Sequence, residues 1–354
     1  MIYFLKKFSK ILFINILIVF SFLILIEIIF GYWFDKDNFG PYMREHRMKN
    51  QRIQYSDGKE KEIYYYRRNY YGFRGVDIKP SEIQALIMGG SVVDERYKPE
   101  KYTITGFLNK SLEENKISLT IVNGGIEGQS TAGQIYNFNY WLSKLENFSP
   151  KFIFFYIGIN DSALAENDTL MNIKQDGHLI NLNKKEIFFD TVKSKSYLYD
   201  SARIFKFKYL PREGFVEYNS QVAKKYKEKK NNFIKYISAK KKYENAKHGM
   251  KYSSIIKNYL SRVDELAVLS KQLNAKPIFI TNIASGGHSD ALYALNSNLI
   301  KHCSDKNYSC IDLAKKIKGK YEYWNDGLHS TRKGSKIISD LIFSELKPII
   351  NSTN

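Results

Sequence analysis

The chain contains very little cysteine. Only Cys303 and Cys310 occur among its 354 residues, which excludes both a scaffold held by many disulfides and a four-cysteine zinc site. Cys303 lies near the end of a predicted helix, and Cys310 near the start of a predicted strand. In an oxidising compartment the short loop between them would let the two sulfurs bond; two ordinary buried thiols are the alternative.

Acidic residues are also scarce relative to basic ones. The chain has 36 Asp and Glu against 55 Lys and Arg, a formal net charge of +19. Such an excess suits nucleic acid, an anionic membrane surface or an acidic glycan, and a solvated lysine-rich surface explains it equally well. Hydrophobic residues make up 44% and aromatic residues 15%, so the chain is not disordered and has enough apolar side chains for a full core.

One long hydrophobic run lies near the N-terminus, over residues 11–30. At ~1.5 Å per residue it is about as long as the ~30 Å hydrocarbon core of a bilayer. It is preceded by three lysines, Lys6, Lys7 and Lys10, and followed by three aromatic residues, Tyr32, Trp33 and Phe34. The lysines predict a cytoplasmic N-terminus, and the aromatic residues suit the far interface.

A cleaved signal peptide is the alternative interpretation of this run. The run is long for such a peptide, and no small-x-small cleavage site follows it. Glu27 interrupts it near its outer end, where the side chain can reach the headgroups. We therefore expect residues 1–34 to be a cytoplasmic tip and an uncleaved transmembrane signal anchor.

Residues 35–80 are polar and aromatic, and we expect a stalk that runs into the following domain and packs on it. Its segment 64–75 alternates tyrosines with arginines, a composition that also suits single-stranded nucleic acid. A segment displayed outside the cell would not meet that partner, so we expect no nucleic-acid binding.

From residue 81 to about 350, apolar strands alternate with helical patterns. The predicted strands cover 85–88, 119–122, 152–157, 277–281 and 310–313, and the predicted helices cover 105–115, 131–145, a stretch ending at 273, 291–302 and a stretch after 330. Continuous apolar strands are buried on both faces. We therefore predict an α/β fold, a doubly wound parallel-sheet three-layer sandwich, with its ligand site at the carboxyl edge of the sheet.

This alternation breaks between about 162 and 259. The stretch is rich in lysine, notably at 224–230 and 240–242, and we interpret it as a partly helical insertion that covers or flanks the site. A solvated charged helix is the simpler interpretation, and a dedicated glycan-binding surface is the alternative.

Ser91 stands where the first strand of the domain turns, directly after Gly89 and Gly90. A strand-to-helix turn exposes a hydroxyl beside free backbone N–H groups, as a nucleophilic serine requires. The same three residues also form ordinary turns. Val92 and Val93 follow, so there is no Gly-x-Ser-x-Gly elbow, which argues against the α/β-hydrolase superfamily.

Asp326 and His329 lie just before the last predicted helix. Three residues apart on a tight turn, the carboxylate can orient the imidazole and stabilise its charged form. A helix cap beside a surface histidine is the alternative. The other histidines have no such setting: His46, His178, His248, His288 and His302.

Gly128 and Asn160 follow the second and third strands. The N–H groups of Ser91 and Gly128 and the side-chain amide of Asn160 are suitable donors for an oxyanion hole. Each residue alone is also typical of a turn.

The order of these blocks resembles the SGNH (GDSL-type) hydrolase family, over roughly residues 84–346. In that family Ser, Gly, Asn and His stand in four ordered blocks, with an Asp three residues before the His. The resemblance implies that Ser91 is the nucleophile, Gly128 and Asn160 oxyanion donors, and Asp326 and His329 the remaining catalytic pair. Gly90 stands where the family usually has Asp, and the segment 69–75 is similar to the lead-in of some members.

The expected function is a serine ester hydrolase of carboxylesterase or deacetylase type. We expect it on the outer face of a bacterial cytoplasmic membrane, held by residues 11–30 and acting on acyl esters of a cell-surface glycan. An O-acyltransferase that modifies a surface polysaccharide is the alternative, and a non-catalytic scaffold on the same fold is a third. No metal and no cofactor are expected.

Overall fold

The computed structural model describes residues 2–31, 33–34, 49–56, 61–69, 71–75, 78–165, 185, 188–189, 192, 195–209, 212–215, 233–244 and 252–351. The chain divides into two compact units. One comprises Met1–Arg44 and Leu182–Pro211, and the other Glu45–Asn181 and Arg212–Asn354. The predicted triad and oxyanion residues all fall in the second unit.

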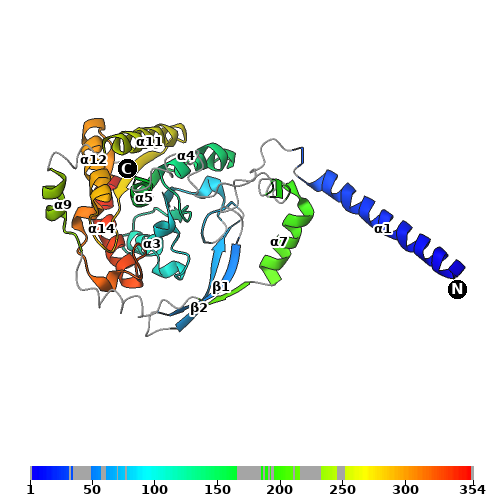
Figure 1. Cartoon of the computed structure of the whole chain (residues 1–354). Helices are drawn as coiled ribbons and strands as arrows, with labels where there is room; N and C mark the ends of the chain where they lie inside the picture. The colour runs from blue at the N-terminus through cyan, green and yellow to red at the C-terminus, as the bar shows by residue number, and fades with distance from the viewer. Residues whose placement is uncertain are drawn as a thin grey trace. The chain divides into compact units, whose positions relative to one another are not determined.

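The first unit contains two long helices, α1 (Ile2–Phe30) and α7 (Tyr197–Tyr209). The stretch Lys6–Phe30 of α1 reaches a mean hydropathy of 2.9, and none of its most apolar window is buried. By length and composition α1 can cross a membrane. The start of α7 lies beside the end of α1 (Figure 1).

The second unit is built on a five-stranded parallel sheet. Its strand order is β4 (Ile121–Asn123), β3 (Ala85–Gly89), β5 (Phe152–Ile157), β7 (Lys276–Thr281) and β8 (Ser309–Ile311). All neighbouring pairs are parallel. The first strand of this sheet along the chain, β3, lies second in the order. The sheet is therefore wound in both directions from β3, and such folds bind ligands outside the carboxyl ends of the strands at this switch point.

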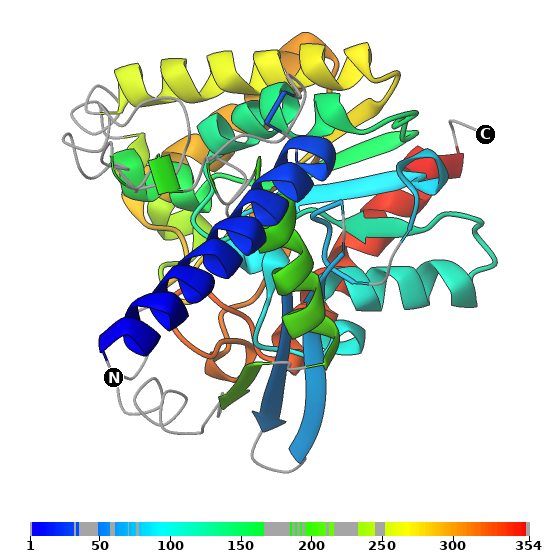
Figure 2. The ribbon, with the colours of Figure 1, turned by 90° about the vertical axis from the view of Figure 1, so that its right-hand side faces the viewer.

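Helices cover both faces of this sheet. Figure 2 shows α11 (Ser253–Gln272) along one side of the strands and α3 (Ile104–Glu114) along the other. Two further helices, α4 (Thr131–Tyr140) and α12 (Asp290–Lys306), contact α11, and α14 (Arg332–Asn351) contacts α3. The predicted doubly wound three-layer fold is confirmed.

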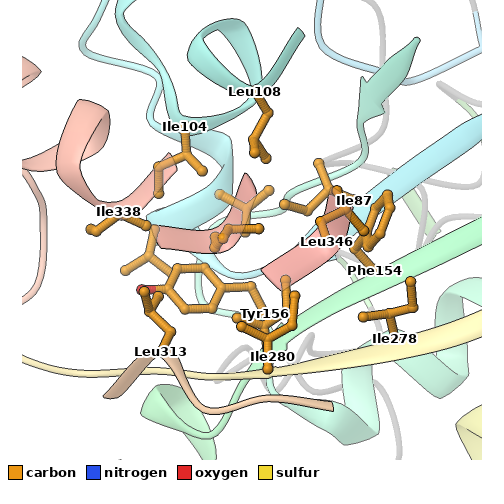
Figure 3. Packing of buried hydrophobic residues seen from close by; sticks show 14 of the residues in the cluster. Ile87, Ile104, Leu108, Phe154, Tyr156, Ile278, Ile280, Leu313, Ile338 and Leu346 are labelled. Carbon is orange, nitrogen blue, oxygen red and sulfur yellow. The ribbon is translucent and has the colours of Figure 1, made fainter. Parts of the chain in front are cut away.

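The core between α3, α14 and the sheet combines aliphatic side chains with aromatic ones such as Phe154 and Tyr156 (Figure 3). Ile104, Leu108 and Leu112 follow one another at four-residue spacing, so α3 turns one apolar stripe toward the strands. Ile342 and Leu346 of α14 repeat the same spacing and are buried. Each such side chain contributes about 1.5–3 kcal/mol by leaving water, and together they fix the strand ends that carry the site.

One predicted helix differs from the structure. The helix expected over 131–145 ends at Tyr140 and is followed by a separate 3-10 turn, η4 (Leu142–Lys144). Trp141 leaves helical geometry, and its indole Nε1 donates to the carbonyl of Tyr71 at 2.7 Å while the ring packs on Phe73 at 4.9 Å. A long-range contact therefore overrides the local helical pattern.

The segment expected as a stalk contains a β-hairpin. The strands β1 (Lys49–Ser56) and β2 (Lys61–Arg68) pair antiparallel, and β6 (Arg212–Phe215) joins β1 in parallel. One buried cluster contains Ile53 and Tyr55 of β1, Tyr64 and Tyr66 of β2, and Tyr102. In the part of the segment that the structure describes, the hairpin thus packs on the domain through its tyrosines.

Of the insertion, α9 (Tyr236–Tyr243) carries the lysines of 240–242, and the lysine run at 224–230 lies outside the described residues. Cys303 of α12 and Cys310 of β8 form a disulfide. The shorter elements are η2 (Pro80–Glu82), α2 (Ser91–Asp94), η3 (Glu100–Tyr102), α5 (Ile159–Ala165), α13 (Leu313–Lys316) and η6 (Tyr321–Tyr323).

Candidate active site

Ser91 is the first residue of α2, directly after β3 and the N-cap Gly90. The buried apolar strand β3 holds the turn, and Gly90 accepts from the N–H groups of Val93 and Asp94 at 3.0 and 3.1 Å. The first N–H groups of a helix have no acceptor within the helix. The hydroxyl of Ser91 therefore stands beside backbone donors at the carboxyl edge of the sheet.

The structure brings His329 to Ser91 and Asp326 to His329. His329 Nε2 lies 2.8 Å from Ser91 Oγ, and His329 Nδ1 lies 2.7 Å from Asp326 Oδ2. An ionised carboxylate only accepts hydrogen bonds, so Nδ1 carries the hydrogen and Nε2 is left to accept the serine proton. These are the contacts of a Ser-His-Asp triad.

The turn that carries Asp326 also fixes its charge. Its Oδ1 accepts from the N–H groups of Leu328 and His329 at 2.7 and 2.8 Å. Partial burial raises the pKa of Asp326, but the hydrogen bonds from the His329 ring and from the two backbone N–H groups outweigh it, and the net pKa lies below 3.8. The carboxylate is therefore ionised at neutral pH, where it can stabilise an imidazolium.

The loop around the pair is tied to the domain by backbone contacts. Asn325 N–H donates to the His329 carbonyl at 2.8 Å, and Ser285 donates to the Gly327 carbonyl at 3.0 Å from both N–H and Oγ. His329 is 30% exposed and Asp326 47% exposed. The imidazole is therefore held in place yet open to solvent and substrate.

The two other predicted donors lie near the nucleophile turn. Asn160 is the second residue of α5, and its Nδ2 donates to the Gln129 carbonyl at 2.7 Å. Gly128 adopts φ +78°, a left-handed conformation that favours glycine. The Asn160 amide has a second hydrogen left for a substrate oxygen. In the part of the chain that the structure describes, no acceptor contacts the N–H of Gly128 or Ser91.

Gly90 makes room for that amide. A Cβ at position 90 would lie 2.2 Å from Nδ2 of Asn160, so any larger residue would displace one of the two groups. Gly90 stands where the SGNH pattern usually has Asp. The departure thus has a structural counterpart: the Asn160 side chain fills the space that a side chain at position 90 would need.

A buried ion pair joins the nucleophile turn to the histidine loop, and sequence reasoning missed it. Lys98 and Glu95 are each 2% exposed and bonded to one another. Lys98 Nζ donates to the Ser330 carbonyl at 2.8 Å, and the hydroxyls of Ser330 and Ser335 donate to Glu95 Oε1 at 3.1 and 2.7 Å. Burial lowers the pKa of Lys98 although Glu95 opposes this. The cluster connects residues more than 200 positions apart.

A second missed cluster surrounds Asp94, three residues after the nucleophile. Asp94 is 1% exposed and accepts from Arg68 at 3.0 Å and from Tyr66 at 2.8 Å, while Arg74 donates to its backbone carbonyl. Burial raises the pKa of Asp94, but Arg68, Arg74 and Arg96 outweigh it and hold the pKa below 3.8. The tyrosine- and arginine-rich segment 64–75 was the signal in the sequence.

A pocket opens beside Ser91. It is lined by Ser91, Val92, Asp94, Glu95, Arg96, Tyr97, Lys98, Glu127, His329 and Ser330. Arg96 and Glu127 form an ion pair of 2.7 Å, with Arg96 21% and Glu127 50% exposed. Charged side chains therefore border the pocket beside the nucleophile. Over the described residues, no group of three or more His, Cys, Asp or Glu is placed to hold a metal ion.

Comparison with known proteins gives a structural likeness only. No protein-family model matches the chain, and no curated protein does. The chain is similar to the psychrotrophic esterase EstA from Pseudoalteromonas sp., with 14% identity, a TM-score of 0.43 and coverage of 75% of this chain and 98% of that one. It is also similar to the acetylxylan esterase Axe2 from Geobacillus stearothermophilus, with 11% identity, a TM-score of 0.41 and coverage of 75% and 94%.

The site residues named from the sequence lie along the carboxyl edge of the sheet. The serine follows the first strand of the sheet, glycine and asparagine follow the next two, and the Asp-x-x-His turn meets the serine from beside the last helix. In its fold and in the order of its site residues along the chain, the chain resembles the SGNH (GDSL-type) hydrolases.

Proposed function

We propose that this chain is a serine ester hydrolase with Ser91 as its nucleophile. The observation that carries the proposal is the pair of contacts at His329, 2.8 Å to Ser91 Oγ and 2.7 Å to Asp326 Oδ2. A serine hydroxyl needs an adjacent base to attack a carbonyl, and the base needs a partner that orients it. The three residues supply both requirements.

In the first half of the reaction, His329 Nε2 takes the proton from Ser91 Oγ as the oxygen attacks the ester carbonyl carbon. The carbonyl oxygen gains the negative charge and lies against the N–H groups of Ser91 and Gly128 and the amide of Asn160. His329 then gives its proton to the leaving alcohol as the carbon–oxygen bond breaks. Asp326 stabilises the imidazolium throughout.

In the second half, water attacks the acyl group on Ser91. His329 takes a proton from the water and returns it to Ser91 Oγ, which releases a carboxylic acid and restores the enzyme. The side chain of His329 is 30% exposed, so solvent water can reach the imidazole. The chemistry uses side chains and backbone N–H groups of this chain, with water as the second nucleophile.

We infer a polar ester as substrate, such as an O-acetyl group on a cell-surface glycan. The pocket beside Ser91 is bordered by the Arg96–Glu127 ion pair, and both side chains can hydrogen-bond sugar hydroxyls. A long acyl chain would instead require an apolar channel. The expected preference is a short acyl group on a hydroxyl-rich alcohol.

We also infer that α1 anchors the enzyme in a bacterial cytoplasmic membrane with the hydrolase unit outside. The apolar stretch Lys6–Phe30 has the length of a span, and Lys6, Lys7 and Lys10 favour a cytoplasmic N-terminus. An external position also suits the Cys303–Cys310 disulfide, because disulfides persist in oxidising compartments.

The decisive experiment measures hydrolysis of p-nitrophenyl acetate by the full chain in detergent, together with labelling by a fluorophosphonate probe. Wild type should turn over the ester and be labelled at Ser91, and Ser91→Ala should lose both. Ser344→Ala is the matched control, since Ser344 is an exposed serine on α14, and it should retain both. Turnover by Ser91→Ala at the wild-type rate would contradict the assignment.

A second assay separates the substrate classes. Acetylated xylo-oligosaccharides and p-nitrophenyl octanoate are offered in parallel, with released acetate and nitrophenol measured. Faster turnover of the acetylated sugar supports the glycan ester, and a preference for octanoate contradicts it. Deacetylated oligosaccharide added with p-nitrophenyl acetate tests the alternative, because only an acyltransferase would form acetylated sugar.

A further inference from the structure

Glu27 is the only acidic residue in the apolar span of residues 11–30, and both of its carboxylate oxygens accept hydrogen bonds within the first unit. Ser196 Oγ and Leu198 N–H donate to its Oε1 at 2.6 and 3.0 Å. Tyr197 N–H and the Trp33 indole donate to Oε2 at 3.2 and 2.8 Å. A carboxylate that accepts the first N–H groups of a helix satisfies those donors and complements the helix dipole. Glu27 of α1 therefore caps α7.

This cap fixes where α7 begins relative to the span. Glu27 lies three residues before Phe30, the end of α1, which corresponds to about 4.5 Å along the helix axis. The Phe30 ring packs on the Tyr197 ring at 5.3 Å, and Ser196, only 8% exposed, also accepts from Tyr199 N–H at 3.0 Å. The first turn of α7 thus lies at the level where an apolar span gives way to headgroups.

The rest of α7 exposes large aromatic side chains. Phe205 is 58% and Tyr209 61% exposed, and their rings pack at 4.9 Å. They lie eight and twelve residues after Tyr197, so helical periodicity places all three within one face. Tyr199 is exposed as well, and so is Lys206. We call Tyr197, Phe205 and Tyr209 the aromatic surface of α7.

We propose that α7 lies in the headgroup layer of the bilayer that α1 crosses and binds lipid through its aromatic surface. The inference rests on the membrane anchoring proposed above. Tyrosine and phenylalanine beside lysine are the side chains that amphipathic helices place at a membrane interface. The hydrogen-bonded connection through Glu27 makes the aromatic surface continuous with the end of the span, which favours lipid over a protein partner.

The span and α7 would then form one membrane-bound unit rather than an anchor followed by a free linker. The cap also opposes cleavage of the segment as a signal peptide, because Glu27 holds a helix that begins more than 160 residues later in the chain. An uncapped α7 would leave Ser196, Tyr197 and Leu198 without their shared acceptor. Glu27 therefore has a structural role inside the first unit, and its position near the headgroups is not its only notable feature.

The test uses the full chain in nanodiscs of phosphatidylcholine and phosphatidylglycerol, one chain per disc. Phe205→Cys carries an environment-sensitive nitrobenzoxadiazole label, and Lys241→Cys, exposed on α9 of the second unit, is the matched control. Doxyl-labelled lipids serve as quenchers. We expect blue-shifted emission at position 205 and quenching several-fold stronger than at 241. Equal emission and quenching at the two positions would overturn the proposal.

Two further variants separate the causes of failure. A label at Ile18→Cys reports on the span itself: if Ile18 is not quenched by lipid, the proposed anchoring fails, and if Ile18 is quenched but position 205 is not, only the lipid contact of α7 fails. Glu27→Ala should move the label at 205 toward the values at 241. No change in that variant would overturn the role of Glu27 as the cap. Esterase turnover is measured separately and tests Ser91 alone.

Discussion

Replacing Lys98 by methionine is expected to destabilise the second unit strongly while leaving its packing volume nearly unchanged. The variant leaves the Glu95 carboxylate 2% exposed and without its cation. Removing one partner of a buried ion pair costs about 3–5 kcal/mol. Glu95 keeps three donors, the hydroxyls of Ser330 and Ser335 and the N–H of Ile104, so we expect the lower end, about 3 kcal/mol.

The matched control is the double variant Glu95→Gln with Lys98→Met. It removes both charges and retains a side-chain amide for the surrounding hydroxyls, so its free energy of unfolding should lie within about 1 kcal/mol of wild type. Urea unfolding of the full chain in detergent, followed by tryptophan fluorescence at pH 7, measures all three proteins. Trp324 is buried and forms a β-bridge with Ser330 of the cluster, so it reports on this region.

The pH dependence gives the same reasoning a second test. Burial lowers the pKa of Lys98 from 10.5 in the folded state. Between that lower value and 10.5 the unfolded chain binds more protons than the folded one, so this group makes stability rise with pH over the window. Relative to the double variant, wild type should therefore gain stability as pH increases toward 10.5.

Two results would refute this account. One is a loss of less than about 1 kcal/mol in the free energy of unfolding for Lys98→Met. The 2% exposure of Glu95 indicates that its carboxylate is desolvated, and so small a loss would contradict this. The other is a double variant as unstable as the single one, which would assign the loss to packing rather than to charge. A free-energy difference between wild type and the double variant that stays constant toward pH 10.5 would contradict the pKa direction.

Three further outcomes are expected. Asp326→Asn should lower kcat on p-nitrophenyl acetate by about 10⁴ with little loss of stability, because His329 then loses its orienting carboxylate; a loss under tenfold would remove Asp326 from the triad. Gly90→Ala should lower kcat by about 10²–10³, since its Cβ would lie 2.2 Å from the Asn160 amide, and unchanged kcat would argue against Asn160 as an oxyanion donor. Replacing Cys303 and Cys310 by serine should cost about 2–3 kcal/mol for a loop with a sequence separation of 7, seen as a lower melting temperature that reducing agent no longer changes; an unaltered melting temperature would show that the disulfide adds nothing.

The sheet was predictable because its signal is local. The strand β5 has the sequence Phe-Ile-Phe-Phe-Tyr-Ile. A continuous apolar strand of this kind is stable when helices bury both of its faces. The strand predicted over 152–157 coincides with β5, and the one predicted over 85–88 is one residue shorter than β3. The site residues follow these strands directly, so the order of motifs located them as well.

The supporting clusters were not predictable, because their partners come from distant parts of the chain. Lys98 lies in a charged stretch that reads as a solvated surface, and only the approach of Ser330, 232 residues later, buries it. Arg68 and Arg74 lie in the segment that was expected to pack on the domain, but the sequence did not identify what they would contact. Their burial depends on Asp94, which nothing in the local pattern marks as a partner.

The Glu95–Lys98 pair has a consequence for the synthesis of the protein. The nucleophile turn leaves the ribosome early, but the hydroxyls that complete the hydrogen bonds of the pair, from Ser330 and Ser335, are made among the last residues. Until α14 docks, the charged groups of Glu95 and Lys98 lack some of their hydrogen-bond partners, and they therefore stay hydrated. A chain that stops before the Asp326–His329 turn therefore lacks its histidine and both hydroxyls that donate to Glu95, and a chain that stops just before α14 still lacks Ser335. Completion of the C-terminal region is therefore needed to assemble the site.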